Sequence, residues 1–585
     1  MSPIRRSFAD TCQSGVVDLV GMSLLQQGVS RSLERLGMKQ WLRSRLAGVL
    51  SLAGSERPAV RAALLYQSLR RLAASNENPT DGPKVLIISF RGAWLLHTTW
   101  EALIAEGIRR RGGSPTILTC SGGLPEALPG RSPACGIANV HVTRPASCSE
   151  CTRCGLSVAG ALDLPILQLR EFVGVSRVRE LTEKVDSLPV SAIPNLEHHG
   201  IPVGRLVLNS SRWFLCASEL DGDADAQSVL RSFAKSGLIV AELAPLLMDR
   251  VQPDVVFLLN GLFFAERILA EEARLRGIRV VTYEHGFLTD TICCSEDIAG
   301  YCDISSLWKG VRDVPLTEEQ DRRLDEYMLA RSRGLGAPFN YWPTVTESES
   351  QIIEALDIDP RLPTAVLFTN VTWDSAVQDR HRFFDSMITW ILDTVNQFAS
   401  RQETQLVIRV HPAEVILPFL ETRDSVLDHL KRALPSLPKN VRLVAPDNDL
   451  SSYTLMRLAH CGLVYTSTVG LEMAMQGIPV VVAGETHYRG KGFTIDPSTR
   501  EQYAALVWEA LGQSRDTAVR DKARRYAYAL FFRYFLPFDL VSENPPLFIP
   551  TARTSDPTRL DPGGDATMDL ICEGILRGAG VYGNG

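Results

Sequence analysis

Five short apolar segments, each followed by a helical pattern, constrain the fold of the second half of this chain. They read TAVLFTN, QLVIRVHP, NVRLVAP, CGLVYTST and IPVVVAG, and they lie between residues 364 and 484. Short runs rich in valine, isoleucine and leucine are typical of strands that are buried on both faces. Alternating strands and helices predict a parallel sheet covered by helices, so we expect a doubly wound α/β domain here.

The same alternation occurs earlier, in KVLIISF, PTILTC, PDVVFLL and IRVVTYEHG, which predicts a separate first domain. A chain of 585 residues is too long for one ordinary domain. The expected organisation is a helical N-terminal segment, two Rossmann-like domains with a cleft between them, and a helical tail. The predicted ranges are 1–80, 81–340, 341–500 and 501–585.

Composition limits the partners and the location. The net charge of −6 argues against a general nucleic-acid binder. No apolar run is long enough to cross a bilayer, and the start of the chain lacks the apolar core of a signal peptide. We therefore expect a cytoplasmic protein. An association with the inner face of the membrane is an open alternative.

The N-terminal segment is where such an association would arise. SRSLERLGMKQWLRSRLAGVL has apolar residues at helical spacing, with basic residues between them. The favoured interpretation is a helix packed on the next domain, with its basic face in water. The alternative is a membrane-surface helix that attracts anionic lipid.

Polar residues follow four of the predicted strands of the second domain. Asn370, His411 and the run Thr466-Ser467-Thr468 stand at three strand ends, and the 484–496 loop follows a fourth. Ligands of open α/β sheets bind at the carboxyl ends of the strands. This agreement across four strand ends predicts a ligand site in the second domain.

Thr466, Ser467 and Thr468 come before a helix that is expected to start near Gly470. Free N–H groups at such a start suit a phosphate, although Ser467 or Thr468 could equally be an ordinary N-cap. Glu472 is placed to hold the hydroxyls of a ribose, and its alternative role is that of a first-turn glutamate favoured by the helix dipole.

Basic residues accompany this run. Arg409 lies two residues before His411 and is expected on the same face of the strand. In HYRGKGFT the glycines allow a close backbone approach to a ligand, and Arg489 and Lys491 add positive charge. A solvated loop is the alternative.

The motifs IRVHP, TSTVGLEMAMQGIPVVVAG and HYRGKGFT resemble the nucleotide-sugar domain of bacterial capsule polysaccharide biosynthesis proteins, notably the Kdo transferases. The resemblance implies a GT-B-like fold and a glycosyltransferase that uses a nucleotide-activated donor, such as a CMP-linked acidic sugar, and a glycan or lipid-linked acceptor. Arg489 and Lys491 depart from the family pattern, so the donor could differ. The donor-binding residues expected on both grounds are Asn370, Arg409, His411, Thr466, Ser467, Thr468, Gly470, Glu472, Tyr488, Arg489, Gly490, Lys491, Gly492 and Thr494.

The first domain contains YEHGFLTD, where the resembling family has Glu-Asp-Gly-Phe. The strand is expected to end at Tyr283, with Glu284 and His285 after it. His285 is the first choice of general base because histidine titrates near neutral pH. Glu284, Asp290 and His97 are the other candidates. An equally weighted interpretation is that Glu284 and His285 only form hydrogen bonds between the domains.

The segment CSECTRC has the spacing of a thiolate metal site. Cys148, Cys151 and Cys154, with Cys120 or Cys135 as a fourth ligand, suit structural zinc. An iron–sulfur cluster is the second choice. The 120–155 region is accordingly expected to be a cysteine-rich insertion, and no organic cofactor is expected.

Other enzymes share this two-domain scaffold, so fold alone does not decide the function. A nucleotide-sugar epimerase and a polyol-phosphate transferase are alternatives, and a non-catalytic polysaccharide assembly protein is a third.

Overall fold

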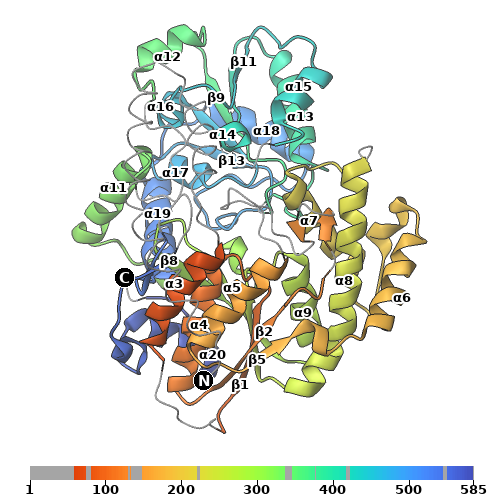
Figure 1. Ribbon diagram of the computed structural model, residues 1–585. Coiled ribbons are helices and arrows are strands. Elements are labelled where there is room, and N and C mark those ends of the chain that lie inside the picture. The colour runs from red at the N-terminus through yellow and green to blue at the C-terminus, as the bar shows by residue number, and fades with distance from the viewer. Residues whose placement is uncertain are drawn as a thin grey trace, which may run out of the picture.

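The computed structural model describes residues 58–73, 81–124, 126–128, 132–133, 148–220, 224–335, 345–375, 377–416, 422–543 and 550–583. The basic N-terminal segment expected to form a helix, and Cys135, lie outside these residues. Two sheets, each covered by helices, stand one above the other in Figure 1.

The first sheet has the strand order β14-β8-β7-β6-β1-β2-β5. Its parallel strands are β1 (Lys84–Ser89), β2 (Ser114–Thr119), β5 (Ile166–Gln168), β6 (Val255–Leu259) and β7 (Arg279–His285). The antiparallel strands β8 (Thr291–Ser295) and β14 (Leu536–Pro537) complete one edge. The chain reverses its direction of strand addition between β1 and β6.

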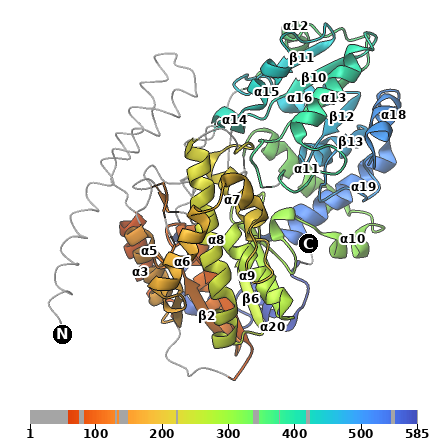
Figure 2. The same cartoon turned by 90° about the vertical axis from the view of Figure 1, so that its right-hand side faces the viewer.

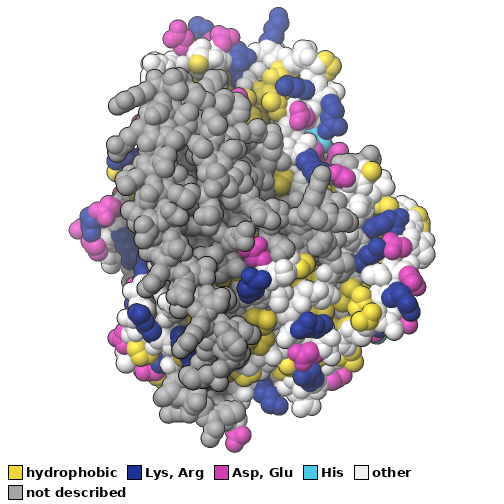
Figure 3. All heavy atoms as spheres, in the orientation of Figure 1, with side chains coloured by type: hydrophobic (Ala, Val, Ile, Leu, Met, Phe, Trp, Pro, Cys, Tyr) yellow, Lys and Arg dark blue, Asp and Glu magenta, His cyan; other side chains and the backbone are white. Residues whose placement is uncertain are grey.

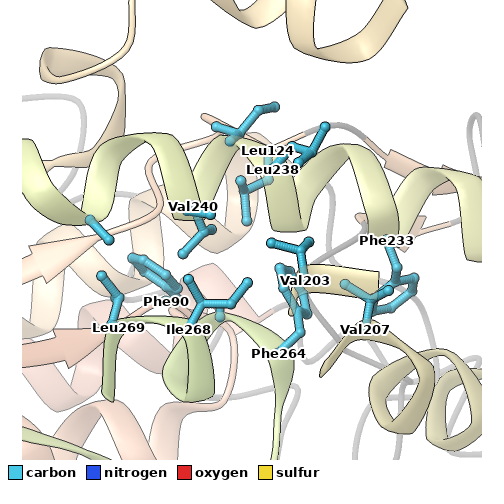
Figure 4. Packing of buried hydrophobic residues seen from close by; sticks show 14 of the residues in the cluster. Phe90, Leu124, Val203, Val207, Phe233, Leu238, Val240, Phe264, Ile268 and Leu269 are labelled. Atoms are coloured by element: carbon cyan, nitrogen blue, oxygen red, sulfur yellow. The ribbon is translucent and has the colours of Figure 1, made fainter. Parts of the chain in front are cut away.

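Helices cover both faces of this sheet because successive residues of β1 point to opposite sides. Leu86 and Ile88 belong to a core under α7 (Val203–Leu215), α8 (Ala224–Val251) and α9 (Phe264–Leu275). Figure 4 shows Phe90 close to Ile268 and Leu269 of α9 and to Val240 of α8. Val85 and Ile87 belong to the opposite core, under α3 (Pro58–Arg70), α4 (Leu95–Arg110), α5 (Cys148–Ala161) and α20 (Ala566–Arg577).

The second sheet is fully parallel, with the order β11-β10-β9-β12-β13. Its strands are β9 (Thr364–Phe368), β10 (Gln405–Arg409), β11 (Val441–Val444), β12 (Cys461–Val464) and β13 (Val480–Val482). Its helices are α12 (Glu349–Ala355), α13 (Met387–Ala399), α14 (Ala413–Ile416), α15 (Val426–Ala433), α16 (Ser452–Leu458), α17 (Val469–Ala474) and α18 (Arg500–Leu511).

Both sheets therefore follow the Rossmann order, with the third, second, first, fourth and fifth parallel strands side by side. The predicted fold class, two doubly wound α/β domains in a GT-B-like arrangement, is confirmed. In the second domain, α13 begins at Met387, after the N-cap Ser386. The strand expected to end at Tyr283 continues to His285, because Glu284 and His285 pair with Cys293 and Ile292 of β8.

The segment predicted as a separate helical tail, 501–585, is divided between the two domains. α18 packs on the second sheet, beside β12 and β13, and α19 (Thr517–Tyr528) continues into a π-helix over Ala529–Tyr534. β14 then joins the first sheet, and α20 packs on α4. Figure 1 accordingly shows the last, dark blue part of the chain beside the first domain.

Smaller elements complete the described chain. They are β3 (Glu126–Leu128), β4 (Ser132–Pro133), α6 (Val175–Asp186), α10 (Ser305–Val311), α11 (Glu318–Ser332), β15 (Val541–Ser542), β16 (Thr551–Ala552) and the 3₁₀ turns Leu169–Glu171, Val190–Asn195, Ala299–Tyr301 and Pro557–Leu560.

A shared apolar core joins the two domains. It contains Cys293 and Trp308 from the first domain together with Phe368 and Tyr488 from the second, and Tyr526 of α19 packs among them. Figure 2 shows α19 and α10 running beside this junction. The two domains are thus packed together rather than linked only by the chain.

The surface charges and the composition of the helices bear on the expectation of a chain without membrane-spanning segments. On the face shown in Figure 3, the described lysines and arginines are interspersed with aspartates and glutamates. Within the described residues, no helix combines the length and the apolar character needed to cross a bilayer.

Candidate active site

The carboxyl ends of β9, β10 and β12 are tied together by side chains. Asn370 lies after β9, and its Oδ1 accepts a hydrogen bond from the backbone N–H of Thr466 after β12, at 3.2 Å. Thr369 Oγ1 accepts from the N–H of His411 after β10, at 2.9 Å. Since β9 and β12 flank the point where the strand order reverses, the predicted residues Asn370, Thr466 and His411 meet at the ligand-binding edge of the sheet.

His411 is held as a neutral hydrogen-bond donor. Its Nδ1 accepts the N–H of Ala413 at 3.1 Å, so the ring proton of the neutral form is on Nε2. Burial, and then the positive charge of Arg409, lower the pKa of His411 to about 4. The side chain can therefore donate Nε2–H to a phosphate or hydroxyl oxygen without adding charge.

The hydroxyl run after β12 has three different environments. Among the described residues, Thr466 Oγ1 is buried and has no hydrogen-bond partner. Ser467 Oγ accepts the N–H of Val469 at 3.3 Å, and Thr468 makes no side-chain cap although it stands before α17. α17 is only six residues long, so its dipole is weak and the Thr466 hydroxyl is the group best placed for a ligand.

Gly470 and Tyr488 form a packing pair. Tyr488 is fully buried, and its hydroxyl donates to the carbonyl oxygen of Ser467. A Cβ on Gly470 would lie 2.3 Å from the Tyr488 hydroxyl oxygen. A side chain at position 470 would therefore collide with Tyr488. Tyr488 supports the 466–468 turn through its hydrogen bond to Ser467 and does not close over a ligand.

Glu472 is paired with a residue that sequence analysis did not select. Arg331 of α11 donates Nε–H to Glu472 Oε1 at 3.0 Å, and the carboxylate is almost fully buried. Burial opposes the charge of Arg331, but the Glu472 carboxylate outweighs it and raises the arginine pKa. Glu472 therefore ties α17 to α11. To bind a ribose hydroxyl, its carboxylate would have to accept that hydrogen bond while it keeps the ion pair with Arg331.

Two of the predicted basic residues bind backbone carbonyls. Arg409 donates to the carbonyls of Ala445 and Asn448 at 2.8 and 3.0 Å, and so holds the loop after β11. Arg489 donates to the carbonyls of Val482, Gly484 and Pro497. Both guanidinium groups position loops at the strand ends.

The rest of the 484–496 loop makes contact with the first domain. Lys491 Nζ donates to Ser305 Oγ of α10 at 2.5 Å. Gly490 and Gly492 have φ of 72° and 83°, which other residues adopt at a cost. Thr494 Oγ1 donates to Asp496 at 2.9 Å.

His487 belongs to the same loop and was missed in the sequence. Tyr526 donates its only hydroxyl proton to the His487 carbonyl at 2.7 Å, so the 3.0 Å contact of Nδ1 with that hydroxyl places the ring proton on Nδ1. Burial, and then the charges of Arg380 and Lys491, lower the His487 pKa to about 3. Within the described chain its buried Nε2 has no partner and is free to accept a hydrogen bond.

In the first domain, Glu284 and His285 point to opposite sides of β7 because they are consecutive residues of a strand. Glu284 Oε2 accepts from Asn260 Nδ2 after β6, and Oε1 accepts from the His285 N–H, both at 2.8 Å. Burial raises the pKa of Glu284, and the negative charge of Asp374 in the second domain raises it further. Glu284 is thus the one that faces the other domain.

His285 lies on the side of α4. Its ring stacks on Trp100, with centroids 5.9 Å apart and planes at 12°, and its Nε2 lies 2.6 Å from Glu543 Oε2. Burial lowers the pKa of His285, but the hydrogen bond and charge of Glu543 outweigh it, so the net shift is upward. Because Glu284 faces the second domain while His285 is paired with Glu543 and stacked on Trp100, the geometry favours Glu284 over His285 as general base.

The two remaining catalytic candidates, Asp290 and His97, make contacts that hold the first domain together. Asp290 accepts from the N–H of Glu543 at 2.8 Å and pairs with Arg553. The ring of His97 lies within 6 Å of the rings of Trp94, Trp100 and Tyr283. Asp290 holds the returning C-terminal segment, and His97 is part of an aromatic cluster.

Three of the four described candidate thiols line the same cavity, and the fourth points elsewhere. Cys148, Cys151 and Cys154 lie on α5, where residues six positions apart point to different sides of a helix. Cys120, Cys148 and Cys151 line one small cavity, whereas Cys154 is buried in the core shared with α4. Burial raises the pKa of Cys151 to about 12, which opposes the thiolate form that binds metal.

Cys135, the other candidate for the fourth ligand, lies outside the described residues. Metal stays a prediction of the sequence. Elemental analysis of protein purified without chelators tests it: about one zinc per chain would support it, and neither zinc nor iron would contradict it.

Two other groups in the described residues bring metal-binding side chains together: His198, His199 and Glu242, and Glu219, Asp424 and His429. Arg177 donates to both oxygens of Glu242, at 2.9 and 3.1 Å. Asp424 accepts from the backbone of Ser218 and Glu219 and from the Ser218 hydroxyl. Hydrogen bonds within the protein account for both groups.

Part of the chain matches the sequence model of a known family. Residues 344–533 match the model of the family described as capsule polysaccharide biosynthesis protein. The resemblance seen in the motifs is confirmed. The capsule-synthesis match extends well beyond those motifs and includes α18 and α19. No curated protein matches the sequence.

Solved structures resemble the chain at low identity. The KpsC β-Kdo 2,4 transferase of Thermosulfurimonas dismutans is 16% identical over 52% of this chain and 86% of that one, with a TM-score of 0.32. The KpsC β-Kdo 2,7 transferase of the same organism is 13% identical over 48% and 79%, with a TM-score of 0.29. UDP-GlcNAc 2-epimerase from Neisseria meningitidis is 13% identical over 76% and 97%, with a TM-score of 0.25.

Proposed function

We propose that this chain is a glycosyltransferase of capsule or other surface polysaccharide synthesis that takes a sugar from a nucleotide-activated donor. The donor would be held by the second domain and the acceptor, a glycan or a lipid-linked glycan, by the first. The observation that carries the proposal is the meeting of Asn370, His411 and Thr466 at the point of strand-order reversal. It lies inside the range that matches the capsule-synthesis family.

The donor site offers neutral hydrogen-bonding groups. His411 presents Nε2–H, Thr466 presents a hydroxyl, and His487 presents an acceptor nitrogen. These groups suit the phosphate, ribose and sugar oxygens of a nucleotide sugar. A CMP-linked acidic sugar is the donor implied by the sequence resemblance.

For the transfer itself, we assign the base to Glu284. The acceptor oxygen forms a bond to the anomeric carbon while the bond from that carbon to the donor phosphate oxygen breaks. The bonding electron pair leaves with the nucleotide, and the proton of the acceptor hydroxyl passes to the Glu284 carboxylate. The raised pKa of Glu284 suits a base that works near neutral pH.

The test of the donor site is nucleotide binding by Thr466→Val, which removes a hydroxyl and keeps the shape of the side chain. A thermal-shift screen of nucleotide sugars first identifies the ligand. Calorimetry is then expected to show affinity lower by about 10- to 100-fold, as for a lost hydrogen bond to a charged group.

Thr404→Val is the matched control, because this buried threonine donates to Arg401 at the opposite edge of the same sheet. It should bind as wild type does. Equal affinity of Thr466→Val and wild type would show that the site is misplaced.

The alternative functions predict different results in the same assays. An epimerase converts its nucleotide sugar without an acceptor, and a polyol-phosphate transferase releases a different nucleotide product. An assembly protein would bind a ligand without turnover. Release of free nucleotide only when an acceptor glycan is present would support the glycosyltransferase.

A further inference from the structure

We propose that Glu543, supplied by the returning C-terminal segment, is a positioning residue that keeps the imidazole of His285 protonated and fixed at the carboxyl end of β7. The catalytic consequence rests on the proposed function, whereas the pairing itself does not. Sequence analysis selected neither Glu543 nor the segment that carries it.

Two contacts define the geometry of His285. His285 Nε2 and Glu543 Oε2 are 2.6 Å apart, and the Glu543 side chain is fully buried while that of His285 is 15% exposed. The second oxygen of Glu543 has no partner in the described part of the chain. The stacked indole of Trp100 fixes the plane of the ring.

A buried carboxylate with one free oxygen is costly unless a cation accompanies it. Glu543 from the C-terminal segment, Glu284 from its own strand and the backbone of Gly286 all favour the charged ring of His285, and burial opposes it. Arg553, the nearby cation, is paired with Asp290.

The Glu543 backbone is held separately from its side chain. Asp290 Oδ1 accepts the Glu543 N–H at 2.8 Å, and the Phe538 N–H donates to the Asp290 carbonyl at 2.8 Å. β14, two residues long, pairs with β8 and ends directly before Phe538. The pairing of β14 with β8 and the hydrogen bonds of Asp290 thus fix the position of the C-terminal segment, and with it the position of the Glu543 carboxylate beside His285.

In the proposed reaction the imidazolium adds positive charge beside Glu284, on the strand that carries the base. Its proton is present below the raised pKa of His285 and is lost as pH rises through it. Activity is therefore expected to have an alkaline limit set by His285. A histidine acting as base would instead give an acid limit.

The test is the titration of His285 by NMR in protein labelled at histidine Cε1, with the signal assigned from a His285→Asn spectrum. Wild type is expected to titrate above the ordinary histidine value of about 6.5. Glu543→Gln removes the charge, so the His285 pKa is expected to fall by about one unit or more, and Glu543→Asp should restore part of the shift. A merely structural Glu543 would leave the titration unchanged, which would overturn the proposal.

Glu272→Gln is the matched control, since this buried glutamate of α9 pairs with Arg276 in the same domain. It should leave the His285 titration as in wild type. If Glu543→Gln does not fold, the wild-type titration still decides, because a His285 pKa below 6.5 contradicts the pairing.

The two proposals fail in different ways. The NMR titration needs no substrate, so an unchanged His285 pKa sinks the pairing and leaves the glycosyltransferase standing. A shifted pKa in a protein that binds no nucleotide sugar supports the pairing and contradicts the proposed function. In active enzyme, Glu543→Gln should also move the alkaline limit of kcat to lower pH, which loss of stability alone would not do.

Discussion

Glu284→Gln is expected to lower turnover by about two to four orders of magnitude, because the amide cannot take the proton of the acceptor hydroxyl. Donor affinity should change little, since the donor is held from the second domain. Asn260 can still hydrogen-bond the amide oxygen, so the fold should persist. The measurement is kcat with saturating donor and acceptor, together with donor binding by calorimetry.

The pH profile gives a separate check of the same residue. Burial and Asp374 raise the pKa of Glu284, and a base must be deprotonated to act. Wild-type kcat/KM is therefore expected to fall as pH decreases through a value above that of an ordinary glutamate, and the residual activity of Glu284→Gln should lack this fall. A full-rate Glu284→Gln enzyme would remove Glu284 as base and return attention to Asp290 and His97.

Arg91→Met should have the largest effect on stability, with the free energy of unfolding of the first domain lower by about 3–5 kcal/mol. Arg91 follows β1, and Glu266 lies on α9; their side chains are 3% and 1% exposed. Arg91 Nη2 donates to Glu266 Oε2 at 3.0 Å, and the guanidinium lies 4.4 Å from the Phe263 ring centroid. Loss of the arginine leaves a buried carboxylate without its cation.

Urea unfolding followed by tryptophan fluorescence measures this change, because Trp94 and Trp100 lie in the same domain. The double variant Arg91→Met with Glu266→Leu should recover much of the loss, since two apolar side chains of similar size often replace a buried ion pair without cost. Equal stability of Arg91→Met and wild type would show that the pair is not desolvated as the structure indicates.

The sequence predicted the sheets well because buried parallel strands leave a strong local signal. It also predicted that Asn370, His411 and Thr466 lie together at one end of the second sheet, since each directly follows such a strand. What each side chain does there depends on contacts that have no local signal. Arg409 and Arg489 were expected to bind the ligand with their charges, yet they bind loop carbonyls. Tyr488 was expected to bind the donor, yet its hydroxyl supports the turn at Ser467.

Long-range partners explain the rest of the difference. Glu543 is 258 residues from His285 and Arg331 is 141 residues from Glu472, so no spacing in the sequence links them. Asn260 had a detectable signal, an Asn-Gly pair directly after the buried strand VVFLL, and could have been selected by the rule that found Asn370. The strand β7 appeared to end early because its last two residues are polar, whereas pairing with β8 extends it.

The return of the C-terminal segment to the first domain also bears on the order in which the protein matures during synthesis. Domains usually fold as the chain emerges, the N-terminal one first. Here β14 at Leu536–Pro537 is the edge strand of the first sheet, and α20 packs against α4, where Gly107 leaves room for Met568. In contrast, the last strand of the second sheet ends at Val482, and α18, which covers that sheet, ends at Leu511. The domain that begins first on the ribosome is thus the last to be completed.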